Sequence, residues 1–316
     1  MSRLTVAIPN HNGRHLLEDM LTSLERQTFR GFTTVVVDDC STDDSLVYMC
    51  ASWPRVEIVR LDRRVGVTAA LNACLARAGT ELVALFNNDM ELEPSCLAEL
   101  VAELDRHPDL GSVTPKMLDF VDRNVIDGAG DMLNWRGGGR RRGHGERDGG
   151  QYDEAEDVFG PCGGAAVYRR AALQVVGGFD EGYYAYYEDV DWAFRAQLAG
   201  FRCRYVPSAV LYHHGSATLG RGFTDFNGYH LWRNPVWLIA KCVPGPALVR
   251  HLPQLLRGQL GNLYAALRAR KLHIWARAMR DALRGLPAAL RKRRAIQRER
   301  AISVSRLEEL ARAGRR

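Results

Sequence analysis

The chain has 316 residues, of which 46% are hydrophobic and 25% charged, a composition that indicates about two globular domains and argues against a disordered chain. Its seven cysteines are an odd number with no C-x-x-C pair, which argues for a reducing compartment and against a disulfide framework or a zinc knuckle. The net charge of +6 is uneven. Residues 247–316 carry 18 Lys/Arg against 4 Asp/Glu, a net of +14 that leaves −8 on residues 1–246.

Strands and helices alternate from the beginning of the chain. An apolar strand over residues 4–8 precedes a helix over 16–24, and a β-branched strand over 33–37 follows. The turn after the first strand contains no G-x-G-x-x-G, so the dinucleotide fingerprint of a nicotinamide-dependent oxidoreductase is missing where that fold needs it. The polar residues that follow these two strands include Pro9, Asn10, Asp38 and Asp39.

The same alternation continues through the first third of the chain. A third strand over 56–60 precedes a small-residue helix over 68–78, and a buried strand over 82–86 precedes a helix that begins at Pro94. This order predicts an α/β fold with a doubly wound, mostly parallel sheet. Its further polar positions are Gly66 and Asn72, beside and on the third helix, and Asn87, Asn88 and Asp89 after the fourth strand.

The carboxyl ends of parallel strands are where open α/β sheets bind ligands. Asp89, with Asn87 and Asn88 beside it, offers the oxygen donors that a hard divalent cation prefers next to a diphosphate. The alternative is an ordinary turn, since Asn and Asp favour turns in all proteins. The other polar strand ends favour the site over the turn.

Two later segments differ from this pattern. Residues 136–150 contain seven glycines and five arginines, which predicts a mobile surface loop too flexible to pack, with a lid or a diphosphate contact as further possibilities. Order resumes with a short strand over 165–168. The segment 177–195, GGFDEGYYAYYEDVDWAFR, then combines acids with a cluster of aromatic residues.

The acids Glu188, Asp189 and Asp191 open a predicted helix that ends near Gly200. A structural interpretation is available, because a helix dipole favours acids in the first turn and Asp191 is spaced to pair with a residue four positions later. In the functional interpretation, the surrounding rings desolvate a carboxylate and raise its pKa towards that of a useful base. His213, at the end of a strand over 209–212, is a candidate metal ligand.

Seven motifs in this order resemble glycosyltransferase family 2, the GT-A fold, and within it the bacterial rhamnosyltransferase-like branch. The resemblance covers roughly residues 3–240. Where the family has a D-x-D metal motif, this chain has Asn87-Asn88-Asp89, with one carboxylate. The motifs are VAIPNHNG (6–13), VVVDDCSTDDS (35–45), GVTAALNACL (66–75), LFNNDMELEP (85–94), GGAAVYRRAAL (163–173), GGFDEGYYAYYEDVDWAFR (177–195) and VPSAVLYHHGS (206–216).

The resemblance implies an inverting sugar transfer by single displacement, with no covalent enzyme intermediate. Asp189 matches the base that deprotonates the acceptor hydroxyl, with Glu188 or Asp191 as alternatives. Asp89 and His213 match the ligands of a Mg²⁺ or Mn²⁺ ion that bridges the donor's phosphates. The residues expected to bind the nucleotide-sugar are Pro9, Asn10, Asp38, Asp39, Gly66, Asn72, Asn87 and Asn88.

We expect residues 1–115 to form the nucleotide-sugar-binding half of a GT-A domain, residues 116–245 its acceptor-binding and catalytic half, and residues 246–316 a basic amphipathic helical extension. The extension can lie on an anionic membrane surface or join copies of the chain in a homo-oligomer. We find no apolar stretch of signal length at the N-terminus, and prolines and basic residues interrupt residues 231–249. The expected location is cytoplasmic, at the inner face of the cell membrane.

The expected donor is dTDP-rhamnose, with UDP-galactofuranose or another UDP-hexose as alternatives. The expected acceptor is a hydroxyl of a cell-surface glycan or of a lipid-linked glycan. A different class of function is an inactive scaffold, or a nucleic-acid-binding protein that uses the basic extension. The intact acids argue against this class, so we expect no nucleic-acid partner.

Overall fold

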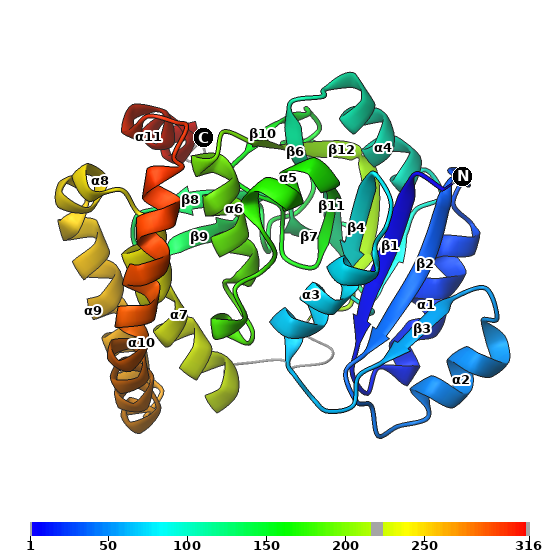
Figure 1. Ribbon diagram of the computed structural model, residues 1–316, viewed down its shortest axis with the longest axis horizontal. Coiled ribbons are helices and arrows are strands. Elements are labelled where there is room, and N and C mark those ends of the chain that lie inside the picture. The colour runs from blue at the N-terminus through cyan, green and yellow to red at the C-terminus, as the bar shows by residue number, and fades with distance from the viewer. Residues whose placement is uncertain (1, 216–223, 314–316) are drawn as a thin grey trace.

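The computed structural model describes residues 2–215 and 224–313 (Figure 1). Ser216, the last residue of the seventh motif, lies outside this part of the chain. The first third alternates strands and helices as predicted. Its elements are β1 (Leu4–Asn10), α1 (Arg14–Glu25), β2 (Phe32–Asp38), α2 (Ser45–Ser52), β3 (Glu57–Arg60), α3 (Val67–Arg77), β4 (Leu82–Phe86), β5 (Met90–Leu92) and α4 (Cys96–Arg106).

The middle of the chain adds mainly strands, and residues 224–313 form helices. The middle elements are β6 (Leu110–Asp119), β7 (Ile126–Gly128), β8 (Asp131–Asn134), β9 (Gly138–Arg141), β10 (Glu156–Val158), β11 (Ala165–Arg169), α5 (Arg170–Val176), the 3₁₀ helix η1 (Glu181–Tyr183), α6 (Glu188–Leu198) and β12 (Arg202–His213). The last helices are α7 (Asp225–Cys242), α8 (Gly245–Arg250), α9 (Leu252–Arg268), α10 (Leu272–Arg298) and α11 (Val304–Ala313).

The central sheet has the strand order β10-β12-β6-β11-β4-β1-β2-β3, with β5 on β12 and β7 on β6. Its β4-β1-β2-β3 half is parallel, and β11 joins it to β6 by antiparallel pairing on both sides. In the parallel half, Asn10 of β1 pairs with Asp38 of β2. The predicted mostly parallel α/β sheet is therefore confirmed, and it brings the predicted polar strand ends to one edge.

Helices cover both faces of this sheet (Figure 1). Successive residues of a strand point to opposite faces, so Ile8 packs with α1 and α4 while its neighbour Ala7 packs with α3 and α6. This burial on both faces explains why β1 and β4 read as nearly continuous apolar runs. The loops at the carboxyl ends remain available for polar side chains.

The glycine-rich segment 136–150 is not the unpacked loop expected from its composition. Part of it is β9, which pairs with β8 in an antiparallel hairpin. The glycines permit close packing instead: a Cβ at Gly138 would lie 2.2 Å from Leu238 of α7, and one at Gly139 would lie 2.7 Å from Val190 of α6. The prediction of a flexible loop was wrong because composition alone does not distinguish glycines that loosen a chain from glycines that let a backbone approach a helix.

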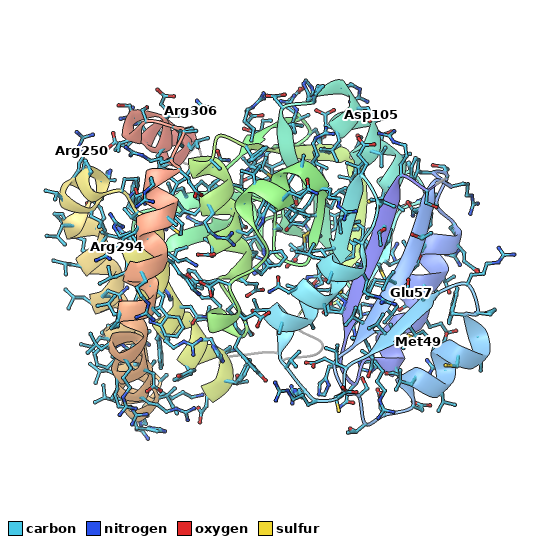
Figure 2. All side chains as sticks on the ribbon, in the orientation of Figure 1. Met49, Glu57, Asp105, Arg250, Arg294 and Arg306 are labelled. Carbon is cyan, nitrogen blue, oxygen red and sulfur yellow. The ribbon has the colours of Figure 1, made fainter. Side chains whose placement is uncertain are left out.

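The last helices form a layer at the side of the sheet (Figures 1 and 2). Helix α10 packs along α7, and α9 packs against α10. Trp232 of α7, Ala266 of α9 and Ile274 of α10 share one buried cluster. Within residues 2–215 and 224–313, none of the helices is long and apolar enough to cross a membrane.

Candidate active site

A cavity of about 260 Å³ lies at the carboxyl ends of β1 and β4, between the start of α3, the β8–β9 hairpin, the start of α6 and the end of β12. It gathers residues that are far apart in the sequence. Of the thirteen predicted site residues, ten line this cavity: Pro9, Asn10, Asp39, Gly66, Asn87, Asn88, Asp89, Glu188, Asp189 and His213.

Asp38 lies behind the cavity wall and organises it. Its carboxylate is fully buried and accepts hydrogen bonds from Asn10 Nδ2 at 3.0 Å and from the Ser41 backbone N–H at 2.9 Å. Asn10 Oδ1 in turn accepts a hydrogen bond from Asn88 Nδ2 at 2.7 Å. This chain joins the ends of β1, β2 and β4, so Asp38 holds the loops while Asn10 and Asn88 face the cavity.

Asp39 connects the second strand to the loop before α3. Its two carboxylate oxygens accept hydrogen bonds from the backbone N–H groups of Val65 at 2.7 Å and Gly66 at 3.0 Å. Gly66 has a φ of +89°, and a Cβ there would lie 2.5 Å from the ring of Tyr184. Only glycine satisfies both conditions without strain, so this position lets the Tyr184 ring lie over the loop.

Asp89 and His213 meet at the base of the cavity. His213 Nε2 lies 3.4 Å from Asp89 Oδ1, and its Nδ1 lies 2.8 Å from Asp127 Oδ2. Asp89 Oδ1 is buried and has no hydrogen-bond partner among the described residues. Burial lowers the pKa of His213, but the carboxylates of Asp127 and Asp89 outweigh it and raise the pKa to about 9.

The side chains of Asp89 and His213 fit a divalent cation that takes only one or two ligands from the protein. Within the described part of the chain, no group of three or more His, Cys, Asp and Glu side chains is placed to hold a metal ion. Mg²⁺ commonly takes one or two protein ligands and completes its shell with substrate phosphates and water. Asp89 Oδ1 and His213 Nε2 suit that arrangement, with Asp127 fixing the His213 ring through its other nitrogen. Binding at Nε2 would require loss of its proton.

Glu188 and Asp189 enter the cavity from the first turn of α6. Asp189 lies over Gly163, where a Cβ would be 2.2 Å from Oδ2, and its Oδ1 accepts the Val190 backbone N–H at 2.8 Å. Burial raises the pKa of Asp189. Burial and the charge of Asp189 raise the pKa of Glu188 to about 8. A carboxylate at this position is therefore a stronger base than a solvated one.

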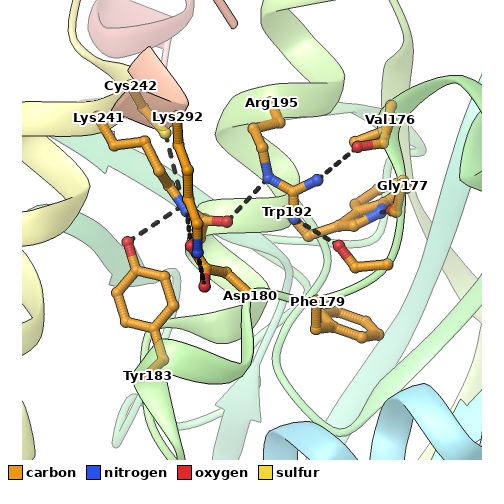
Figure 3. A network of polar contacts seen from close by, with 12 residues as sticks. Val176, Gly177, Phe179, Asp180, Tyr183, Trp192, Arg195, Lys241, Cys242 and Lys292 are labelled. Atoms are coloured by element: carbon orange, nitrogen blue, oxygen red, sulfur yellow. Dashed lines mark hydrogen bonds and ion pairs between the residues drawn. The ribbon is translucent and has the colours of Figure 1, made fainter. Parts of the chain in front are cut away.

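Asp191 and Asn72 lie outside the cavity. Asp191 is fully buried and accepts from Arg195 Nε at 2.8 Å, and Lys241 Nζ lies 2.6 Å from its other oxygen. Figure 3 shows Arg195 and Lys241 within this network of polar contacts. These cations outweigh burial and lower its pKa. Asn72 binds the backbone of Phe179 through both its amide oxygen and its nitrogen. Both side chains thus anchor the segment 177–195 that presents Glu188 and Asp189.

Three charged residues at the site were not anticipated from the sequence: Arg64 and Arg141, which line the cavity, and Asp127. Arg141 lines the cavity from β9, and its Nη1 lies 2.9 Å from Asp127 Oδ2. Successive residues of a strand point to opposite faces. If the hairpin had been recognised from the sequence, Arg141 would have been placed on the opposite face from Arg140 and Arg142. Asp127 carried no local signal, because its partner His213 lies 86 residues further along the chain.

The mostly parallel sheet with an acidic cavity at its carboxyl edge has the architecture of the GT-A glycosyltransferases. The model of the family described as "Glycosyl transferase family 2" matches residues 5–177, more than half of the chain, so the protein belongs to this family. The family and fold expected from the seven motifs are thereby confirmed.

Individual relatives agree with this assignment. The chain is 29% identical over 242 residues to the "N-acetylglucosaminyl-diphospho-decaprenol L-rhamnosyltransferase" of Mycobacterium tuberculosis (strain ATCC 25618 / H37Rv), covering 68% of this chain and 77% of that one. Two solved structures show the fold alone. GalNAc-T7 with UDP, GalNAc and Mn²⁺ matches with TM-score 0.62 and 18% identity over 76% of this chain and 48% of its own. The mannosyltransferase PcManGT from Pyrobaculum calidifontis, with GDP-Man and Mn²⁺, matches with TM-score 0.56 and 20% identity over 94% and 85%.

Proposed function

We propose that the protein transfers a sugar, with inversion, from a nucleotide-diphosphate donor to a hydroxyl of a cell-surface or lipid-linked glycan. The donor half is residues 1–115, the acceptor half is residues 116–245, and residues 246–316 are the helical extension. The proposed donor is dTDP-rhamnose. Support comes from the rhamnosyltransferase-like motifs and from the Mycobacterium tuberculosis relative named as a rhamnosyltransferase.

One observation carries the proposal: a single cavity joins the base Asp189 to the ligand pair Asp89 and His213. Asp189 accepts the proton of the acceptor hydroxyl while the oxygen of that hydroxyl forms a bond to the anomeric carbon. The bond between that carbon and the phosphate oxygen breaks on the opposite face, and its electron pair leaves with the nucleoside diphosphate. The raised pKa of Asp189 suits this proton transfer.

The leaving diphosphate must be stabilised in a cavity that is itself acidic. Asp89 and His213 would hold Mg²⁺ or Mn²⁺, which supplies positive charge to the phosphate oxygens when bound. Arg141 adds a fixed positive charge at the wall of the same cavity. Its guanidinium is oriented by Asp127, the carboxylate that also orients His213.

UDP-galactofuranose and UDP-hexoses remain alternative donors on the same site. The residues expected around the nucleotide hold a pyrimidine without defining its sugar, and donor choice depends on the shape of the cavity near Arg141 and Tyr187. A panel of sugar nucleotides separates these donors directly. The same panel tests whether the site binds nucleotides at all.

The experiment measures the melting temperature with dTDP-, UDP- and GDP-sugars, with and without Mn²⁺. A ligand at ~100 times its Kd adds about 2.7 kcal/mol to the free energy of unfolding. We expect stabilisation that requires Mn²⁺ in the parent and is lost in Asp89→Ala, while the control Glu154→Ala, at an exposed position, behaves as the parent.

A second variant separates binding from chemistry. Asp189→Asn should retain the metal-dependent nucleotide stabilisation and lose roughly 10²–10⁴-fold in turnover, the usual contribution of a general base. If no sugar nucleotide changes the melting temperature of the parent, the assignment of the donor site is wrong. If Asp189→Asn turns over at the parent rate, Asp189 is not the base.

A further inference from the structure

The outer face of α9 carries large apolar side chains that are exposed to solvent. Their exposed fractions lie between 51% and 64% at Leu252, Leu256, Leu260, Tyr264 and Leu267, which we call the α9 stripe. A surface helix ordinarily turns such residues towards the core. Helix α9 instead buries Leu255 and Ala266 and presents the larger set outwards. This surface therefore has the composition of a contact surface.

The α9 stripe is continuous and has a basic border. At about 100° per residue, its five residues fall within an arc of about 120° along the helix. Arg257 and Arg268, both exposed, lie directly beyond one edge of that arc. Helix α9 contains no Asp or Glu, so no acid interrupts this surface.

The neighbouring helix α10 also exposes apolar and basic side chains. Leu283 and Leu290 of α10 are exposed, and so are two groups of arginines, at 277, 280 and 284 and at 291, 294 and 298. Among the described residues, Arg291, Arg294 and Arg298 have no ion-pair partner. The helix has one acid within its bounds, Asp281. Figure 2 shows the side chains of α9 and α10, including Arg294, at the outer side of the molecule.

We propose that the α9 stripe and the arginines of α9 and α10 dock the protein on the surface of an anionic lipid bilayer. Leucines and an aromatic residue enter the boundary between headgroups and acyl chains, while arginines contact lipid phosphates. Charge complementarity selects this occupant. Residues 247–316 carry +14 and residues 1–246 carry −8, so an anionic surface attracts the extension and repels the body. A second copy placed on the same face would bring two positive surfaces together.

The docking surface lies one helix away from the active site. Phe226 of α7 lines the cavity, and Trp232 of the same helix packs with Ile274 and Ala278 of α10. Docking would therefore keep the cavity close to lipid. The proposal does not depend on the donor or on the metal, and vesicle binding tests it without any measurement of turnover.

The test is flotation of the full chain with vesicles of phosphatidylcholine alone or mixed with phosphatidylglycerol. Deleting residues 247–316 is unsuitable, because α10 packs along α7 and its loss would expose the core. We use the surface variant Leu256→Gln/Leu260→Gln and expect roughly tenfold weaker binding per leucine. The control Val47→Gln/Val175→Gln changes apolar residues elsewhere that are at least as exposed, and should bind as the parent.

A second variant measures how much the arginines contribute to vesicle binding. Arg291→Gln/Arg294→Gln should weaken binding to mixed vesicles by roughly fivefold per arginine and have little effect on phosphatidylcholine vesicles. Equal binding of the leucine variant and the parent would overturn the proposal, as would equal binding of the parent to both vesicle types. A dimer in solution that the leucine variant dissociates, without vesicle binding, would assign the α9 stripe to a second copy instead.

Discussion

Two acids separated by one residue should respond oppositely when each is replaced by its amide. Asp191 is fully buried and held by Arg195 and Lys241, whereas Asp189 lines the cavity and has a raised pKa. The replacements Asp191→Asn and Asp189→Asn each remove one negative charge and almost no volume. They therefore distinguish an acid that stabilises the fold from one that serves the reaction.

The magnitude for Asp191→Asn follows from what the substitution leaves behind. The Lys241 and Arg195 side chains are 3% and 11% exposed, so both would stay buried after losing their shared carboxylate, with Asp180 left as a counter-charge for Lys241 and backbone carbonyls as the acceptors for Arg195. Breaking a buried ion pair by removing one partner costs about 3–5 kcal/mol. In a chain of this size, that loss lowers the melting temperature by roughly 5–15 °C.

Asp189→Asn should leave the melting temperature unchanged or raise it, because it removes a carboxylate whose charge burial disfavours. Calorimetry and a turnover assay on both variants, beside Asp62→Asn at an exposed control position, measure the contrast. The reasoning is refuted if Asp189→Asn melts as early as Asp191→Asn, or if Asp191→Asn melts with the parent.

Three other substitutions test the surroundings of the site. Burial keeps the Glu188 carboxyl protonated in the folded chain, with a pKa of about 8, whereas the unfolded chain loses that proton at lower pH. The parent therefore loses stability as pH rises from about 5 to 8, and Glu188→Gln does not. Urea unfolding should show the variant becoming more stable relative to the parent across this range. Asp127→Asn removes the carboxylate that orients His213 and should weaken Mn²⁺ binding by roughly 10–100-fold in calorimetric titration; unchanged affinity would contradict this role. Gly164→Ala, at φ +88°, should cost about 1–3 kcal/mol of unfolding free energy, whereas Gly79→Ala, in open space, should match the parent.

The parallel half of the fold could be predicted because its signals are local. Strands β1, β2 and β4 are short apolar runs that end in polar residues, and parallel pairing forces those ends to one edge. The register of Asn10 with Asp38 then follows from topology, and so does the approach of Asn88 to Asn10. The position of Asp189 came from its motif, since an acid at a helix start has a structural explanation of its own.

The other half escaped prediction because its interactions join distant segments. The hairpin β8–β9 contains more glycine and arginine than apolar residue, so it lacks the periodicity by which strands are recognised. Asp191 differs from Asp189 through Lys241, which lies fifty residues later in α7. Nothing local to the sequence of α6 separates the two acids.

The charges at the site suggest why donor and cation should bind together. Asp89 and Asp189 line the cavity with Arg141 and His213, while Asp127 already neutralises much of the charge of those two cations. A diphosphate entering alone would meet the carboxylates of Asp39, Asp89 and Asp189 as well as Arg64 and Arg141. A cation entering alone would find two protein ligands and must displace the proton of His213. Each ligand supplies what the other lacks, and linkage then requires that each raise the affinity of the other by the same factor.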